Sequence, residues 1–264
     1  MTFNMDILEE FYNDIYSPEL QGEGKSFLMA LAARDKYQMP GEGYVMCNKT
    51  EMLAREYIGS DNFTVFIAKL HRLVGNDLAY LDKNYRPIPE HLKVLYVAIN
   101  SVDLVSAYCL FMKKLAERNE ELIQRKDRPV SSYTINNLWT ASMQTCPTSR
   151  KWFDFDLDLN PDSGMTPNEL GDLVYDSMTR AFPYEPIRIV TTHGGVHMLA
   201  SNRNMSRECN PKTIQEHLGS EFRNMCKEVT LNKNGLIPCP GTLQGGVMVG
   251  YRPYNPEEIK DEQK

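Results

Sequence analysis

The hydrophobic pattern of the first third of the chain is irregular. Apolar residues spaced by three and four predict short helices over residues 5–16 and 50–58. Residues 63–78 fit a helix and a strand equally well, because their apolar positions satisfy both periods. We therefore expect residues 1–90 to be largely helical.

The pattern becomes clearer from residue 91 onward. A β-branched apolar run at residues 94–99 predicts a buried strand, and helical spacing predicts a long helix over residues 102–125. Thr166, Pro167 and Glu169 have the form of a capping box that opens a helix. The other predicted elements are a helix at 133–143, strands at 151–158, 187–190 and 196–200, a helix at 211–226 and a strand-turn-strand unit at 229–249.

These elements predict an α+β fold with mixed or antiparallel sheets flanked by helices. No internal repeat and no linker divides the chain, so we expect a single domain over residues 1–264 whose chemistry-bearing motifs lie at 91–250. Residues 256–264 are polar and predict a solvated tail.

Three carboxylates on one predicted strand are the first candidates for chemistry. Asp154, Asp156 and Asp158 alternate with apolar residues, so they fall on one face of the strand. Two carboxylates at positions i and i+2 are close enough to share a hard divalent cation. The alternative is a solvated strand face of alternating polarity.

A glycine pair precedes a histidine on a second predicted strand. Gly194 and Gly195 leave room for a phosphate to approach the backbone, and His197 follows them. A structural histidine is the simpler alternative. His193 and His197 also have the spacing of a helical zinc pair, but the two glycines between them disfavour a helix.

Charge and cysteine usage narrow the class of protein. The formal net charge is −6, from 29 Lys and Arg against 35 Asp and Glu, which argues against nucleic-acid binding through bulk positive charge. The six cysteines form no C-x-x-C pair, which indicates reduced thiols and no structural zinc. No apolar stretch approaches the roughly 18 residues of a membrane span. We expect an intracellular protein without membrane association, in the cytoplasm or in the nucleus of a host cell.

Three segments, taken in order, resemble the motifs of the archaeo-eukaryotic primase superfamily. The run FDFD at 153–156 is similar to the first motif, in which hydrophobic residues surround D-x-D on a strand. The run TTHGGVHML at 191–199 resembles the second, in which a turn leads to G-V-H on a strand. The run EVTLNKNGLIPCPGTLQGG at 228–246 is similar to the segment of catalytic small subunits in which an acid and V-T precede P-G-S/T-L. The resemblance implies a primase catalytic core with RRM-like elements.

Carried over residue by residue, the resemblance implies a two-metal site for Mg²⁺ or Mn²⁺. Asp154, Asp156 and Glu228 would be the catalytic metal ligands, while Thr191 and His197 would bind the incoming nucleotide. The implied activity is that of a DNA primase or primase-polymerase catalytic subunit, which makes RNA or DNA primers from NTPs or dNTPs on a single-stranded DNA template. A large primase subunit or a replicative helicase is the candidate protein partner.

The chain also departs from the family pattern. Glu228 stands where Asp is usual, Pro238 and Cys239 replace a basic residue, and Gln244 replaces a histidine. Substitute phosphate-binding residues are Arg203, which we include in the nucleotide site, and Arg207, Lys227 and Lys233. These departures motivate an alternative function, that of a non-catalytic primase-fold replication protein that binds single-stranded DNA or a helicase. A third alternative is an unrelated α/β protein with accidental motif matches.

Overall fold

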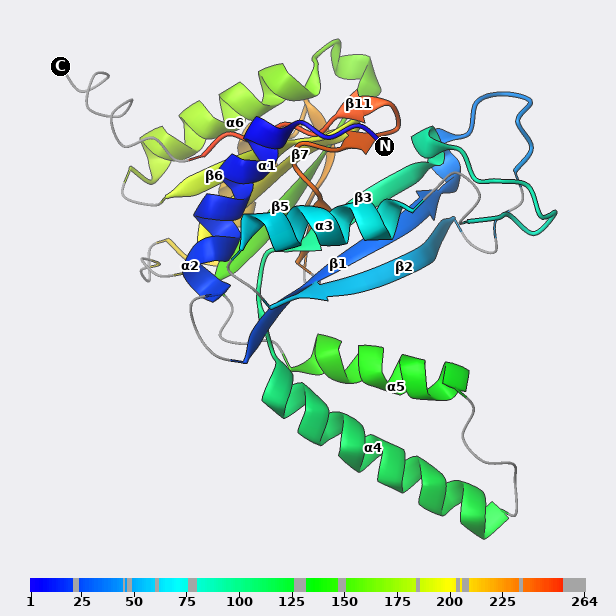
Figure 1. Ribbon diagram of the computed structural model, residues 1–264. Coiled ribbons are helices and arrows are strands. Elements are labelled where there is room, and N and C mark those ends of the chain that lie inside the picture. The colour runs from blue at the N-terminus through cyan, green and yellow to red at the C-terminus, as the bar shows by residue number, and fades with distance from the viewer. Residues whose placement is uncertain are drawn as a thin grey trace.

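Two antiparallel sheets, each covered by helices, form the body of the protein in a computed structural model (Figure 1). The structure describes residues 1–20, 24–44, 46, 49–59, 62–75, 80–125, 132–146, 151–183, 186–202, 205, 209–232 and 235–253. The strands are β1 (Lys25–Arg34), β2 (Thr50–Ile58), β3 (Lys93–Ala98), β4 (Val102–Asp103), β5 (Trp152–Leu159), β6 (Ile187–Thr191), β7 (Gly195–Ser201), β8 (Cys226–Asn232), β9 (Leu236–Pro238), β10 (Leu243–Gln244) and β11 (Val247–Met248). The α-helices are α1 (Met5–Phe11), α2 (Ser17–Leu20), α3 (Phe63–Val74), α4 (Leu104–Arg125), α5 (Ser132–Thr145), α6 (Pro167–Ala181) and α7 (Pro211–Glu221), and a π-helical turn, Tyr12–Tyr16, joins α1 to α2.

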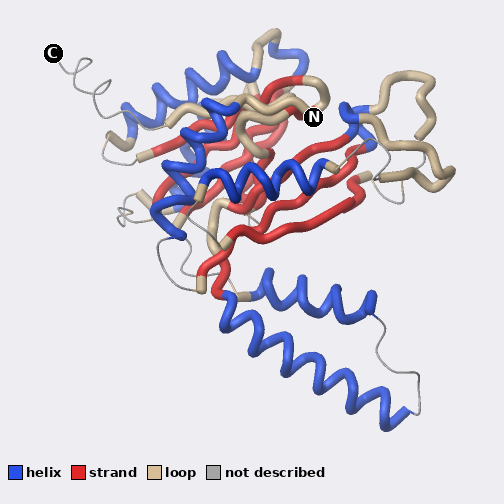
Figure 2. The backbone as a smooth tube through the Cα atoms, viewed as in Figure 1, coloured by secondary structure: helices blue, strands red, loops and turns tan. Residues whose placement is uncertain are grey.

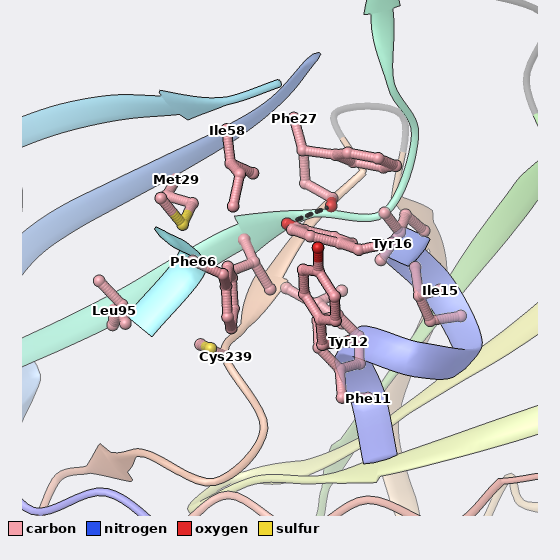
Figure 3. Packing of buried hydrophobic residues seen from close by; sticks show 14 of the residues in the cluster. Phe11, Tyr12, Ile15, Tyr16, Phe27, Met29, Ile58, Phe66, Leu95 and Cys239 are labelled. Carbon is pink, nitrogen blue, oxygen red and sulfur yellow. Dashed lines mark hydrogen bonds between the residues drawn. The ribbon is translucent and has the colours of Figure 1, made fainter. Parts of the chain in front are cut away.

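The first sheet has the order β2-β1-β3-β9, with β4 also paired to β1. Its inner face packs against α1, the π-helical turn and α3 around an aromatic cluster (Figure 3). Tyr16 stacks on Phe27 with ring centroids 4.0 Å apart, and its hydroxyl donates a hydrogen bond of 2.9 Å to the carbonyl of Ala98. Phe66 of α3 meets Tyr16 edge to face, so the cluster joins both helical segments to the sheet.

The second sheet has the order β6-β7-β5-β8, and its neighbouring strands are all antiparallel. The chain builds it in the order β5-α6-β6-β7-α7-β8. Strand alternation places the apolar residues of β5 and β7 on one face, where α6 and α7 cover them. The core on this face includes Phe155, Leu157, Leu170, Val174, Val196, Met198, Ile214 and Leu218. The opposite face of β5 and β7 carries Asp154, Asp156 and His197, together with Trp152 and Leu199, which belong to the core of the first sheet.

Asn100 ties the two sheets together. Its side-chain oxygen accepts hydrogen bonds of 2.9 Å from the backbone N–H groups of Lys151 and Trp152, and its Nδ2 donates to the carbonyl of Trp152 at 3.0 Å. The side chain thus acts as a short extra strand partner at the start of β5. Farther along, the chain passes from β8 in the second sheet to β9 in the first.

Replacing Asn100 by Ala is expected to lower the free energy of unfolding by about 2 kcal/mol, because partly buried backbone groups lose their hydrogen-bond partners. Urea unfolding followed by circular dichroism measures the change. Asn84→Ala, in an exposed turn, is the control and should leave the midpoint nearly unchanged. Equal midpoints for the two variants would contradict the structural role of Asn100.

Helices α4 and α5 pack against each other as a hairpin that projects from the body (Figures 1 and 2). The base of the hairpin contains Val102, Ala107 and Met143, and Tyr57 of β2 packs against this cluster. Within the described part of the chain, no helix combines the length and hydropathy that a membrane crossing requires.

The predicted α+β class with antiparallel sheets is confirmed, as is the capping box at Thr166 and Glu169. The predicted helix at 50–58 is wrong: these residues form β2, so residues 1–90 are mixed rather than largely helical. A bulge explains the error. The pairing register of β1 with β2 shifts between Leu31 and Ala32, so Leu53 is an extra residue on β2. This residue interrupts the alternation of apolar and polar positions along β2, and the resulting spacing of apolar residues resembles that of a helix. The ambiguous segment 63–78 contains α3, and the predicted tail at 256–264 lies outside the described residues.

Candidate active site

The carboxylates predicted to share one face of a strand do so on β5. The side chains of Phe155 and Leu157 lie in the core beneath α6 and α7, so those of Asp154, Asp156 and Asp158 lie on the opposite face. Exposure increases along the row. The Asp154 side chain is fully buried, that of Asp156 is 36% exposed, and Asp158 is exposed.

His197 lies directly beside this row because β7 pairs with β5 in a register that sets His197 opposite Asp156. Its Nδ1 is 3.0 Å from Oδ1 of Asp154, and its Nε2 is 3.8 Å from Oδ1 of Asp156. Burial by itself would lower the pKa of His197, but the attraction and hydrogen bond of Asp154, with smaller contributions from Asp156 and Asp158, raise it to about 9. The imidazole is therefore cationic at neutral pH.

Strand β8 completes the face on the other side of β5. Glu228 lies opposite Asp158, Thr230 opposite Asp156, and Asn232 opposite Asp154. Nδ2 of Asn232 donates a 2.7 Å hydrogen bond to Oδ2 of Asp154. Both oxygens of Asp154 are thus engaged, one by His197 and the other by Asn232. Glu228 is exposed. It lies four residues along β8 from Asn232, the residue opposite Asp154, which is a distance of about 13 Å along the strand.

The donor chemistry of this face fits a hard divalent cation, although the described residues contain no group of three acidic, His or Cys side chains already arranged around one ion. Asp156 and Glu228 offer open carboxylates, and Asp158 neighbours both, since it lies two residues from Asp156 on β5 and directly opposite Glu228 on β8. Burial, Asp158 and Asp154 raise the pKa of Asp156 against the opposing effect of His197, and a bound cation would relieve that repulsion. Asp154 fits the ligand role less well, because it would have to share an oxygen already bonded to His197 or Asn232.

Basic and phenolic groups at the end of β1 and just after it lie within electrostatic reach of the carboxylate row, and no motif in the sequence marked them as candidates. Arg34 ends β1, and its Nη1 donates a hydrogen bond to the Tyr96 hydroxyl, while its Nε is buried without a partner. The hydroxyl of Tyr37 is likewise buried without a partner. Burial and Arg34 lower the pKa of Lys36, and Asp158 and Asp156 partly oppose that shift, so Lys36 lies within electrostatic reach of the row. The sequence does contain a signal for these residues, because the basic residues Arg34 and Lys36 stand at the end of a long apolar strand.

The structure does not bring Thr191 to this face. Thr191 pairs with Val196, whose side chain lies in the core on the helical face of the sheet. Its Cγ2 lies only 2.9 Å from where a Cβ on Gly171 would stand, and Gly171 belongs to α6. Thr191 is therefore separated from His197 by the sheet itself. Arg203, Arg207 and Lys233 lie outside the described residues.

The P-G-T-L segment supports the turn between β6 and β7. Oε1 of Gln244 accepts a 3.0 Å hydrogen bond from the backbone N–H of His193, and the ring of His193 packs edge to face against Tyr37. His193 and His197 therefore have different partners, as expected for a turn rather than a helical zinc pair.

No protein-family model, curated protein or solved structure matches the chain.

Proposed function

We propose that the protein is a metal-dependent nucleotidyltransferase of the primase or primase-polymerase type, acting on NTPs or dNTPs with a single-stranded DNA template. The observation that carries this proposal is the pairing of the β5 carboxylate row with the cationic His197, with Lys36 within electrostatic reach of the row. Carboxylates that hold divalent cations beside groups that bind phosphate are what in-line phosphoryl transfer requires.

The architecture supports a primase-type core. The order β5-α6-β6-β7-α7-β8, forming one four-stranded antiparallel sheet with two helices on one face, follows the β-α-β-β-α-β scheme to which RRM-like elements belong. In this sheet the three motif-bearing strands, β5, β7 and β8, are neighbours.

Each residue has a distinct task in the proposed reaction. Asp156 and Glu228 would hold Mg²⁺ or Mn²⁺, with Asp154 and Asp158 beside them, and the ions would supply Lewis-acid stabilisation of the phosphoryl oxygens. His197 donates from Nε2 to the triphosphate while Asp154 fixes its orientation through Nδ1. Asn232 in turn holds Asp154. The buried, unpartnered Nε of Arg34 and hydroxyl of Tyr37 are donors available to the nucleotide.

Primer synthesis on single-stranded DNA tests the proposal directly. The protein is incubated with template and labelled NTPs or dNTPs, first with Mg²⁺ and then with Mn²⁺, and the products are separated on a gel. We expect metal-dependent products that are absent in EDTA. Absence of product with every metal and nucleotide, both alone and with a preformed primer, contradicts catalytic function.

The engagement of both Asp154 oxygens favours a second candidate, a non-catalytic primase-fold protein that binds single-stranded DNA or a helicase. Calorimetry separates the two functions. Metal-dependent NTP binding that is lost in His197→Ala supports the enzyme, whereas binding of template alone supports the second candidate.

A further inference from the structure

A polar cavity of about 440 Å³ lies between the second sheet and the helical N-terminus, away from the carboxylate row. Its volume is in the range of small-molecule sites and far exceeds the space that a single water needs. The walls come from the π-helical turn, α2 and the ends of β5, β6 and β7. The lining residues are Asp14, Ile15, Pro18, Glu19, Lys151, Trp152, Pro186, Arg188 and Ser201.

Arg188 is held in this cavity in a fixed orientation. Its Nε and Nη2 donate to the two oxygens of Asp14 at 2.8 and 2.7 Å, and its guanidinium lies 4.6 Å from the ring centroid of Trp152. The hydroxyl of Tyr251 also donates to Asp14, at 2.6 Å. The remaining nitrogen of Arg188, Nη1, is buried without a hydrogen-bond partner. An unused guanidinium donor of this kind is suited to an anionic oxygen.

The surrounding charges favour an anion as well. Lys151 and Lys25 both pair with Glu19, so the cluster contains three cations, counting Arg188, against the two carboxylates of Asp14 and Glu19. Lys151 remains about one quarter exposed, and its ammonium group has three donors. One negative charge would neutralise the cluster, and a phosphodiester carries one.

Asp14 owes its position to an unusual backbone. The residues Tyr12–Tyr16 form a π-helical turn, a rare conformation that is frequently found at functional sites. The turn places Asp14 and Ile15 on the cavity wall. Trp152 lies on the same face of β5 as Asp156 and four residues away from it, about 13 Å along the strand. A nucleic-acid strand that reaches the carboxylates is therefore within range of the cavity.

We propose that this cavity binds a phosphate group of a nucleotide unit in single-stranded nucleic acid, with Arg188 Nη1 and Lys151 as the donors. The apolar residues Ile15, Pro18 and Pro186 line the space left for the rest of the nucleotide. The choice of nucleic acid as the source of the phosphate rests on the proposed function. The site itself is separate from the carboxylate row and needs no metal, so its test does not depend on catalysis.

Binding of a fluorescein-labelled oligothymidylate, measured by anisotropy in EDTA over a range of salt concentrations, tests the site. We expect Lys151→Gln to weaken binding about tenfold at low salt and to reduce the slope of log Kd against log salt by about 0.7, as loss of one phosphate contact does. Arg188→Lys keeps the charge but removes Nη1, so affinity should fall with little change in slope. Lys212→Gln, which removes an exposed lysine of α7 on the helical face of the sheet, is the matched control and should leave both quantities unchanged.

Thermal melting confirms that each variant is folded. If Arg188→Lys does not fold, Lys151→Gln alone tests the site. We expect Lys151→Gln to fold, because Glu19 still pairs with Lys25 in that variant. A second outcome also supports a phosphate site here. In that outcome the variants bind the oligonucleotide as the wild-type protein does, but they lose the binding of inorganic phosphate that calorimetry detects for the wild-type protein. The ligand is then a free anion at the same site. Wild-type oligonucleotide binding in the variants, with no binding of inorganic phosphate to the wild-type protein, overturns the proposal.

Discussion

Asp156→Asn is expected to reduce template-dependent nucleotide incorporation about a thousandfold, because a neutral amide replaces the partly exposed carboxylate next to His197 that is open to a divalent cation. The same substitution should weaken Mn²⁺ binding measured by electron paramagnetic resonance in the absence of nucleotide. The amide is nearly the same shape as the carboxylate, so the fold should be retained. Adding Asp154→Asn should leave no measurable synthesis, since His197 then also loses its charged partner.

The control for this prediction is Asp162→Asn. Asp162 is an exposed carboxylate in the loop after β5, and its removal alters the net charge in the same way without touching the row. It should retain wild-type incorporation and Mn²⁺ binding. Wild-type incorporation by Asp156→Asn in the presence of metal is the outcome that would remove Asp156 from the proposed site.

Gly195→Ala is expected to produce the largest loss of stability. A Cβ at Gly195 would stand 2.0 Å from the carbonyl oxygen of Leu157 and 3.0 Å from the amide nitrogen of Leu159. Both obstacles are backbone atoms of β5, so strands β5 and β7 would have to separate. We expect the free energy of unfolding to fall by about 3 kcal/mol, at the upper end of the usual cost of overpacking.

Gly194 provides a matched control one residue earlier. A Cβ there meets nothing within 4 Å, so Gly194→Ala should have a urea midpoint close to that of the wild-type protein. If Gly195→Ala unfolds at the same urea concentration as Gly194→Ala, the close approach of β7 to β5 is incorrect, and with it the placement of His197 beside the carboxylates.

The part of the site that lies on one strand was predictable from the sequence. Alternation with Phe153, Phe155 and Leu157 was enough to put Asp154, Asp156 and Asp158 on one face, because the side-chain period of a strand is a local property. The turn at Gly194 and Gly195 and the following strand were predictable for the same reason. The helix that begins after Thr166 carried its own capping signal.

Contacts between strands were not predictable in the same way. Asp154 was expected to act as an open ligand, yet the register of β7 and β8 buries it between His197 and Asn232. Glu228 was expected to be a metal ligand together with Asp154 and Asp156, and the same register sets it opposite Asp158. A shift of two residues in pairing would keep every side chain on its face but change which residues lie opposite one another, and alternation within a single strand does not specify that choice.

By itself, the sequence determined which residues share a strand face, where α6 begins and which turn precedes His197. The tertiary structure alone decided that residues 50–58 form the edge strand β2, that Lys36 and Tyr37 lie near the carboxylates, and that Arg188 lines a separate cavity with Asp14. Local periodicity follows from backbone geometry within a few residues. The other features depend on strand pairing and on packing between segments as much as 237 residues apart, which are settled only when the whole chain folds.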